Sequence, residues 1–482
     1  MSLKVYNVLT RKKEIFIPQE EKKVKMYACG ITASGEAHIG HAYQAIVFDM
    51  IRKYLEYIGY DVIYVRNYTD VDDKIIIRAK ELGVNPKVYA EEIMTEIDEQ
   101  LIMLNVEPPT IQSKATECIQ EMIDFISELI KKGHAYSTEN GDVFFSVESF
   151  ANYGKFSNRI VEEERSGVRK EVEPGKRDEK DFTLWKNAKD DEIFWKSPWG
   201  KGRPGWHIEC SAMSIKYLGK ALDIHGGGKD LIFPHHENEI AQSEALTGKQ
   251  FSKYWIHNGL IKVNGFKMSK SLNNGILIKD LLELYNSDVI RMTLLQNNYR
   301  SDMNIIDGIF EINEEKIYNI YKLFDLIDRL GENYMADENS DIIIKIESEF
   351  ILAMNNDFNS SVAIANLLNY INEMMRLISD SNSIQDLVNM KYALIKTYNV
   401  LGLLQQSPKK VISQIKSKYL IANNISEKEI EELIRKRNQF KQKKNYEEAD
   451  LIRDNLLERG IQIKDTKDIT EWDINHSNSK KH

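Results

Sequence analysis

Residues 24–65 read VKMYACGITASGEAHIGHAYQAIVFDMIRKYLEYIGYDVIYV, and this stretch decides the fold class. Its hydrophobic pattern predicts a short apolar strand over Val24–Cys29, an amphipathic helix over Gly40–Gly59 and a second strand over Val62–Val65. This is the order of a βαβ unit, so we expect an α/β protein built on a Rossmann-type parallel sheet. Such sheets bind ligands at the carboxyl ends of their strands, and the start of the helix favours an anion there.

Two short strings indicate nucleotide chemistry at that position. His38-Ile39-Gly40-His41 places two imidazoles at the predicted start of the helix. Lys267-Met268-Ser269-Lys270-Ser271 places two ammonium groups on a hydroxyl-rich loop. Each string alone has an ordinary explanation, because four-residue matches arise by chance and loops rich in Lys and Ser are usually solvated turns. The surrounding βαβ pattern favours the phosphate-binding interpretation.

Composition sets limits on the class of protein. A length of 482 residues accommodates about three domains of roughly 150 residues each. The net charge of −9 argues against a general polyanion binder, so any contact with nucleic acid must come from local basic patches. No basic-then-apolar leader opens the chain, and no apolar run approaches the roughly 20 residues that span a bilayer. We therefore expect a cytoplasmic protein without a membrane partner, and a monomer.

The three sparse cysteines argue against a disulfide framework and fit a reducing compartment. Two of the three, Cys29 and Cys210, lie near candidate ligands, and His235 and Glu239 are four residues apart on a predicted helix. Two thiolates, an imidazole and a carboxylate would form a tetrahedral zinc site. The alternative is that each cysteine is a small buried hydrophobic residue.

At this point the chain resembles class I aminoacyl-tRNA synthetases, and further segments resemble the cysteinyl-tRNA synthetase family over nearly the whole length. The matching segments are Asn67–Lys74, Phe182–Lys186, Ser197–Gly200, Gly202–Met213 and His225–Leu231. The resemblance implies that Cys29, Cys210, His235 and Glu239 hold one Zn²⁺ per chain, with His236 as the substitute if one assignment is off. It implies tRNA(Cys), L-cysteine and ATP with Mg²⁺ as substrates.

The resemblance also explains the metal, because a steric pocket separates cysteine from serine by only about 1–3 kcal/mol. Zinc binds a thiolate directly, whereas the hydroxyl of serine ionises less readily and is a harder donor. We expect the reaction to pass through a cysteinyl-adenylate, with charge on the phosphates stabilised by His38, His41, Lys267 and Lys270. The expected nucleotide-binding set is Gly30, Thr32, His38, Gly40, His41, Lys267, Ser269, Lys270 and Ser271.

The resemblance implies a substrate pocket formed by Thr69, Trp206, His225 and Asp230. Asp230 would pair with the substrate ammonium, Thr69 would supply a hydroxyl and Trp206 would wall the side chain. Their ordinary alternatives are a solvated carboxylate, a strand-end hydroxyl and a core indole. The chain departs from the family pattern at six positions, which leave every proposed catalytic group in place: Ala33, Ser34, Gly35, Tyr43, Phe266 and Asn273.

The organisation implied by the resemblance is modular. We expect the first catalytic half over 1–114, a connective insertion over 115–204, the second catalytic half over 205–250, the loop and stem-contact region over 251–307, a helical bundle over 308–404 and an anticodon-binding module over 405–472. Residues 473–482 are expected to be disordered. The stretch without proline or glycine between Glu332 and Leu401 predicts uninterrupted helices, and a stripe of apolar residues from Ile317 to Ile327 predicts a bundle face.

The last module offers two candidate contacts with tRNA. Residues 435–444 form a dense basic run that could contact phosphates, although such a run is usually one solvated helix face. Trp472 could stack on an anticodon base, or it is an ordinary half-buried tryptophan.

Three other functions compete with the synthetase hypothesis. A related ligase joins cysteine to an amino-sugar and typically lacks the anticodon module, so the residues after about 400 argue against it. A catalytically silent tRNA-binding paralogue conflicts with the intact histidines and metal-ligand candidates. A simple nucleotidyltransferase of the same superfamily would be a much shorter chain.

Overall fold

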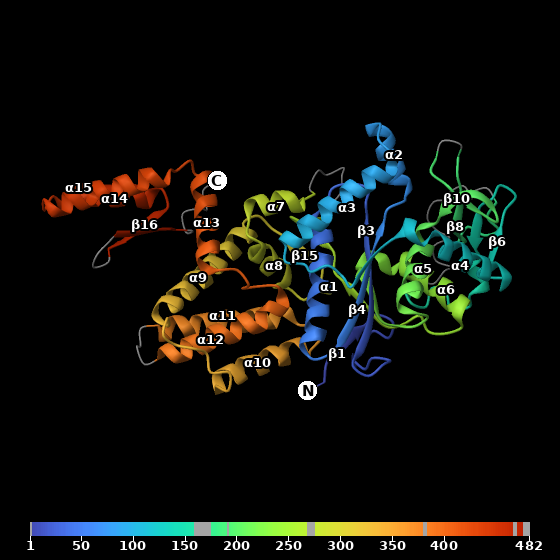
Figure 1. Cartoon of the computed structure of the whole chain (residues 1–482), viewed down its shortest axis with the longest axis horizontal. Coiled ribbons are helices and arrows are strands. Elements are labelled where there is room, and N and C mark those ends of the chain that lie inside the picture. Colours follow the sequence, from blue (N-terminus) through green and yellow to red (C-terminus); the bar gives the residue numbers. More distant parts are fainter. Residues whose placement is uncertain are drawn as a thin grey trace.

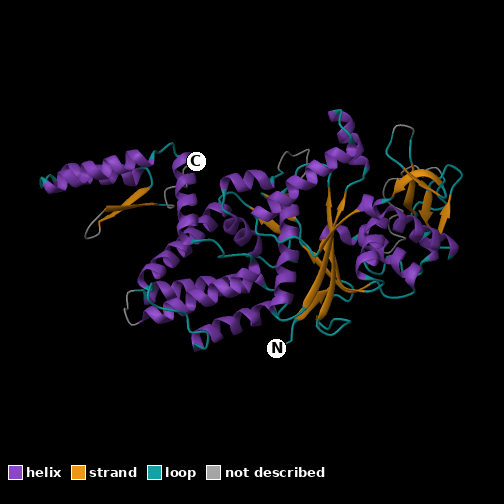
Figure 2. Ribbon diagram, in the orientation of Figure 1, coloured by secondary structure: helices purple, strands orange, loops and turns teal. Residues whose placement is uncertain are grey.

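The computed structural model describes residues 2–158, 175–189, 192–267, 275–378, 383–465 and 470–475. The molecule is elongated, with a parallel sheet in its middle, a small antiparallel sheet on one side and the helical second half on the other (Figure 1). Figure 2 shows that most strands lie in the first half of the chain and that helices dominate the second.

The central sheet confirms the predicted βαβ unit. Its strand order is β12-β11-β3-β4-β5, and all neighbours are parallel. Met26 pairs with Ile224 on one side and with Tyr64 on the other, so β3 lies at the centre. The strands are β3 Lys23–Thr32, β4 Asp61–Thr69, β5 Ile111–Lys114, β11 Leu222–Gly228 and β12 Ser252–Asn258.

Helix α1, Ile39–Tyr57, connects β3 to β4 and lies in the core of the catalytic half. Thirteen of its residues are buried, because the sheet covers one side and later helices cover another. The flanking helices are α2 Asp73–Leu82, α3 Pro86–Met103, α5 Trp206–Leu218 and α6 His235–Thr247. A hairpin of β1 Lys4–Asn7 and β2 Lys12–Ile15 packs beside β12.

A second sheet interrupts the central one. After the short helix η1, Ala115–Cys118, and α4, Ile119–Lys131, five antiparallel strands run in the order β6-β7-β8-β10-β9. This insertion lies at the right of Figure 1, beside α5 and α6. Its strands are β6 Ala135–Ser137, β7 Val143–Phe145, β8 Phe182–Asn187, β9 Trp195–Ser197 and β10 Gly200–Pro204, with the short helix η2 Val147–Ser149 between β7 and β8.

A three-stranded sheet and two helices lead out of the catalytic half. The sheet has the order β14-β13-β15, and its strands are β13 Ile261–Val263, β14 Phe266–Lys267 and β15 Met303–Ile305. The helices are α7 Ile278–Leu284 and α8 Ser287–Leu295.

The bundle confirms the predicted apolar stripe. Ile317, Ile320, Tyr321, Phe324 and Ile327 are all buried on α9. The helices of the second half are α9 Ile309–Leu330, α10 Asp341–Met354, α11 Ser360–Leu377, α12 Ile384–Tyr398, α13 Pro408–Ala422, α14 Glu427–Gln442 and α15 Tyr446–Glu458, followed by the hairpin of β16 Ile461–Asp465 and β17 Thr470–Ile474.

The stretch from Glu332 to Leu401 forms α10, α11 and α12 in its described residues, in line with the predicted helices of a bundle. Asp357 and Phe358, with φ of +68° and +50°, form the break between α10 and α11. The side chain of Asp357 accepts hydrogen bonds from Tyr6 N, Tyr299 Oη and Arg300 Nε, which stabilise the break without glycine or proline.

One prediction about this half was wrong, because the disordered tail does not begin at residue 473. Asp473 and Ile474 belong to β17, because Asp473 pairs with Lys322 and Lys416 and Ile474 is buried. Residues 476–482 lie outside the described part of the chain. Among the described residues, no helix is both long enough and apolar enough to cross a bilayer.

Candidate active site

The first signature lies at the start of α1, as the sequence predicts. His38 is the N-cap residue, and its Nδ1 accepts the backbone N–H of Gly40 at 3.1 Å. The Nδ1 of His41 accepts the backbone N–H of His38 at 3.3 Å, and the two rings stack with centroids 3.7 Å apart. Because each Nδ1 accepts a hydrogen, each neutral ring carries its proton on Nε2. The helix start therefore offers two ring N–H donors beside its positive dipole end.

Burial keeps these imidazoles uncharged near neutral pH. Burial lowers the pKa of His38, and the carboxylate of Asp230 raises it by a smaller amount. Burial and the neighbouring His38 lower the pKa of His41 to about 3. The pair consequently acts through hydrogen bonds in the free protein rather than through positive charge.

The predicted metal ligands converge in the structure. Cys29 comes from β3, Cys210 from the second turn of α5, and His235 and Glu239 from one face of α6. One ligand atom from each of these four residues lies within 4.8 Å of the others, and all four residues are buried. Glu239 Oε1 lies 3.1 Å from His235 Nε2 and 3.3 Å from Cys29 Sγ.

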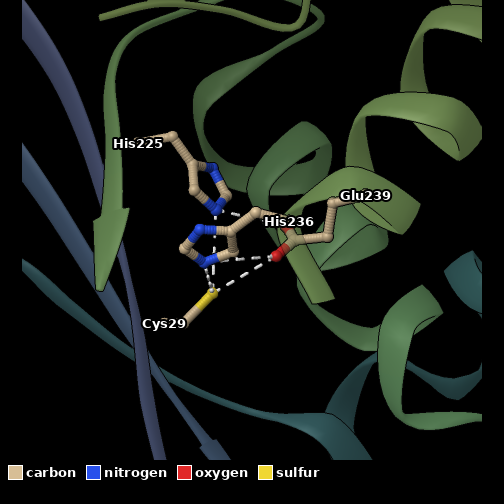
Figure 3. Close-up of side chains that lie close together, drawn as sticks. All are labelled: Cys29, His225, His236 and Glu239. Atoms are coloured by element: carbon tan, nitrogen blue, oxygen red, sulfur yellow. Dashed lines mark hydrogen bonds and ion pairs between the residues drawn. The ribbon is translucent and has the colours of Figure 1, made fainter. Parts of the chain in front are cut away.

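A second donor set shares Cys29 and Glu239 with the first. It adds His225 from β11 and His236 from α6, and Figure 3 shows these side chains pointing toward one another. His236 Nε2 lies 3.3 Å from Cys29 Sγ, and His225 Nε2 lies 3.2 Å from Glu239 Oε2. The sequence prediction placed His225 in the substrate pocket, whereas the structure places it in this cluster.

The cluster fits a zinc ion. Glu239 is fully buried among thiols and imidazoles, and its Oε2 lies 3.2 Å from His225 Nε2 without the geometry of a hydrogen bond, so a cation would stabilise this carboxylate. Thiolate, imidazole and carboxylate are the ligand types that zinc prefers. Burial would raise the pKa of Glu239, but His225 and His235 hold it well below its usual value. Burial likewise opposes ionisation of Cys210, but hydrogen bonds with Cys29 and His235 lower its pKa to about 6.

Two histidines that the sequence prediction did not single out contact the Nδ1 atoms of His235 and His236. His207 Nδ1 lies 3.0 Å from His235 Nδ1, and His257 Nε2 lies 2.7 Å from His236 Nδ1. Metal-bound imidazoles usually use the second ring nitrogen in this way. His257 had a usable signal, because it is the last residue but one of a buried strand and lies toward the same edge of the sheet as Cys29.

The other predicted pocket residues differ in their surroundings. The half-exposed Trp206 stacks on His235 with centroids 4.3 Å apart. Thr69, at the end of β4, donates its hydroxyl to the buried Glu209 at 2.7 Å, and burial raises the pKa of Glu209 well above its usual value. Asp230 is exposed and follows the three glycines of β11.

Close backbone approach explains several glycines. A Cβ at Gly30 would lie 1.6 Å from the carbonyl oxygen of Asn67, so this position admits no side chain without movement of the backbone. Asn67 Oδ1 accepts the N–H of Gly30 at 2.8 Å and lies 3.7 Å from Cys210 Sγ. Thr32 pairs with Thr69 across the two strands, at the ligand-binding edge of the sheet.

The second signature lies mostly outside the described residues. The backbone of Lys267 ends β14, and Ser269, Lys270, Ser271 and Asn273 fall in the undescribed stretch 268–274. The chain that follows this stretch pairs with the start of α1, because Ile276 O accepts the N–H of Ile39 and Ala37 O accepts the N–H of Ile278.

The remaining departures from the family pattern have structural roles or lie on the surface. Tyr43 is fully buried and donates its hydroxyl to Tyr299 O at 3.0 Å. Ala33 donates its N–H to Thr69 O, and Ser34 O accepts the hydroxyl of Tyr89. Phe266 is 65% exposed. Gly35 has open space around it.

The basic run at 435–444 is only partly free for a ligand. Arg437 is buried and forms a bidentate ion pair with Asp465, and Lys441 Nζ binds the same carboxylate at 2.8 Å. Lys436 pairs with Glu432. Arg435, Lys443 and Lys444 are exposed and remain the candidates for phosphate contact. Trp472 is half-buried, with Lys416 Nζ 4.3 Å from its ring centroid, so that cation covers one face.

Comparisons with known proteins agree with this geometry. Family models match residues 15–314 as a class I (C) tRNA synthetase catalytic domain, residues 349–405 as a DALR domain and residues 427–472 as a cysteinyl-tRNA ligase anticodon binding domain. The cysteine–tRNA ligases of Geobacter sulfurreducens and Thermodesulfovibrio yellowstonii are each 45% identical to 98% of this chain, and the matches cover 100% and 99% of those proteins.

Solved structures share the fold at low identity. Mycobacterium tuberculosis methionyl-tRNA synthetase in complex with methionyl-adenylate superposes with a TM-score of 0.60 at 14% identity, over 80% of this chain and 93% of that one. A ternary complex of Agrobacterium radiobacter LeuRS with tRNA and LeuAMS gives 0.59 at 12% identity, over 82% and 87%.

Proposed function

Since the chain belongs to the cysteine–tRNA ligase family of class I tRNA synthetases, we propose a two-step reaction in which it attaches L-cysteine to tRNA(Cys). The cysteine carboxylate attacks the α-phosphorus of ATP, which is accompanied by Mg²⁺, and pyrophosphate leaves. A ribose hydroxyl of the terminal adenosine of tRNA then attacks the adenylate carbonyl, and AMP leaves. The observation that carries the proposal is the buried cluster around Cys29 and Glu239, at the same sheet edge as the His38–His41 pair.

The start of α1 handles the nucleotide in this proposal. His38 and His41 present Nε2–H donors, and the helix dipole adds to their attraction for phosphate oxygens as charge shifts to the leaving group. Gly30 and Gly40 provide backbone close to the same place, and Thr32 lies at the same strand end. Lys267 and Lys270 supply the positive charge that the neutral imidazoles lack, with Ser269 and Ser271 beside them on the loop.

The buried cluster selects the amino acid. Cys29, Cys210, His235 and Glu239 would hold a zinc ion, with His207 and the neighbouring His236–His257 pair fixing the rings. When bound, zinc supplies a strong attraction for the thiolate of cysteine that the hydroxyl of serine does not share. Trp206 walls the side chain, and Asp230 pairs with the substrate ammonium.

In this proposal Thr69 accepts a hydrogen bond from the ammonium group of the cysteine substrate. Its own hydrogen is directed to Glu209, so its oxygen faces the pocket only as an acceptor. His225 lies against the cluster and orients Glu239.

The anticodon module argues for tRNA rather than an amino-sugar as the acceptor. Residues 427–472 resemble the anticodon binding domain of cysteinyl-tRNA ligases, and an amino-sugar ligase has no use for such a module. The exposed Arg435, Lys443 and Lys444 offer local positive charge on a chain with a net charge of −9.

The deciding experiment measures transfer of labelled cysteine, and in parallel labelled serine, to total tRNA by the purified protein with ATP and Mg²⁺. We expect charging with cysteine and none with serine. If tRNA stays uncharged while cysteine-dependent pyrophosphate exchange proceeds, activation is right and the acceptor is a different molecule.

A further inference from the structure

Side chains at the start of α6 face two different parts of the fold. His235 and Glu239 point to the cluster, as described above, whereas Glu237 and Asn238 point to the antiparallel insertion. All four side chains are buried. The same turn of helix therefore contacts both the predicted metal centre and a different part of the fold.

A short segment of the insertion, residues 153–157, binds that second face. Glu237 Oε1 accepts the N–H of Gly154 at 2.8 Å, and Oε2 accepts the N–H of Ser157 at 2.7 Å. The hydroxyl of Tyr153 donates to Asn238 Oδ1 at 2.6 Å. Both oxygens of a buried carboxylate are thus satisfied by backbone donors of one segment, which fixes the segment and the helix relative to each other.

Phe156, in the same segment, packs behind the histidines of the cluster. Its ring lies 4.8 Å from Trp255 and 6.1 Å from His257, measured between centroids. Trp255 in turn contacts His225 at 4.5 Å, and His257 binds His236. The insertion therefore reaches the cluster by two routes, through α6 and through β12.

We propose that residues 153–157 are a positioning element of the metal centre, which sets the first turn of α6 and, through it, the selection of cysteine over serine. The inference rests on the proposed function, because it needs a metal in the cluster. Glu237 and Phe156 are positioning residues, since they act through His235, Glu239 and His257 and do not touch the substrate. Partners behind metal ligands commonly change metal affinity by about 10–100-fold when they are removed.

The sharpest variant is Glu237→Gln. Glutamine has almost the same size, but its amide nitrogen must face one of the two backbone N–H groups, so one donor loses its acceptor and meets another donor. Tyr153→Phe is a milder variant, because it removes only the hydroxyl on Asn238. Asp181→Asn is the matched control. Asp181 is also a buried carboxylate of the insertion that accepts a backbone N–H, from Val147, and a hydroxyl, from Tyr136, and both of these partners belong to the insertion itself.

The experiment uses the full-length protein loaded with zinc. We measure the rate at which zinc is released to a chromogenic chelator, the cysteine and ATP KM values in pyrophosphate exchange, and the unfolding midpoint. We expect Glu237→Gln to release zinc roughly tenfold faster and to raise the KM for cysteine about as much, with the KM for ATP unchanged. Tyr153→Phe should show a smaller change of the same kind, and Asp181→Asn should lower the unfolding midpoint without either effect.

The results separate this inference from the function it rests on. If wild-type protein holds no zinc and activates no cysteine, the proposed function fails. If the wild type does both but Glu237→Gln and Tyr153→Phe release zinc no faster than Asp181→Asn, the positioning role is wrong. Should Glu237→Gln fail to fold, the comparison of Tyr153→Phe with Asp181→Asn decides the matter alone.

Discussion

The thiol of Cys210 is the side chain on which the predicted metal site depends most directly. Its pKa is lowered to about 6, and it lies in a cluster with Cys29, His235 and Glu239. Serine at this position keeps the size but supplies a hard, poorly ionised donor, so we expect Cys210→Ser to lose zinc and cysteine activation together. Metal analysis and cysteine-dependent pyrophosphate exchange check this. Cys118→Ser is the control, because that buried thiol belongs to neither donor set. A Cys210→Ser protein that kept both properties would contradict the assignment.

His41 makes stability depend on pH with a definite sign. Its pKa is about 3 in the folded protein, against 6.5 for an unperturbed histidine. As pH falls through this window, the unfolded chain binds a proton at His41 that the folded protein does not, so the free energy of unfolding decreases and then levels off below about pH 3. His41→Asn should therefore show a shallower loss of stability between pH 6.5 and 4 in urea-unfolding curves. Identical slopes for the two proteins would rule out a neutral His41.

Among the elements, α1 and α8 are joined by a buried ion cluster. Asp49 on α1 lies 3.0 Å from Arg291 on α8 and 3.1 Å from Lys53. Arg291 is fully buried, and its other nitrogens donate to the carbonyls of Leu104 and Leu401. The helix that begins at His38 is thereby fixed to the entry of the helical half.

Removal of this carboxylate should weaken the junction strongly. Asp49→Asn leaves the buried guanidinium of Arg291 without its charge partner, and we expect a loss of about 3–5 kcal/mol in the free energy of unfolding. Urea unfolding followed by circular dichroism measures it. Glu20→Gln serves for comparison, because the Glu20–Lys25 pair is exposed and its loss should leave the unfolding midpoint nearly unchanged. A midpoint equal to that of Glu20→Gln would show that the cluster contributes little.

In the molecule as a whole, the insertion and the module that matches the anticodon binding domain lie at opposite ends of the elongated shape (Figure 1). The insertion lies beside α5 and α6, which carry Cys210, His235 and Glu239, and α14, α15 and the β16–β17 hairpin lie at the far end. The far module is attached to α9 through Asp473, which binds Tyr318 and Lys322. Adenylate formation and tRNA recognition are therefore expected to be separable by truncation.

A chain ending at Ala422 tests this separation. It keeps α13, whose Val411 and Ile415 are buried in the core of the helical half, and it removes residues 427–472, which match the anticodon binding domain. We expect cysteine-dependent pyrophosphate exchange close to that of the full chain, and charging of tRNA reduced by at least about tenfold, because contacts worth about 1.4 kcal/mol or more are lost. Parallel assays of exchange and charging decide it. Equal charging by both proteins would place tRNA recognition elsewhere.

The amino-acid sequence by itself determined the elements and the chemistry that depends on local spacing. Strand, helix and strand over residues 24–65 follow from hydrophobic periodicity, and the placement of His38 and His41 at the helix start follows from their position within it. His235 and Glu239 share a face because residues four apart on a helix do so in any fold. Family motifs added a predicted set of metal ligands and the class of reaction.

Only the tertiary structure decided which distant groups meet. Cys29 and Glu239 are 210 residues apart, and it is the order of β3 and β11 in the sheet that brings them to one edge with His225, His236 and His257. The spacing of residues along the chain predicts neither the hydrogen bond from Gly154 to Glu237 nor the ion pair between Arg437 and Asp465. The physical reason is that the hydrophobic periodicity of a helix or strand shows only which of its faces is buried. Buried polar contacts depend on how several helices and strands pack against one another at once.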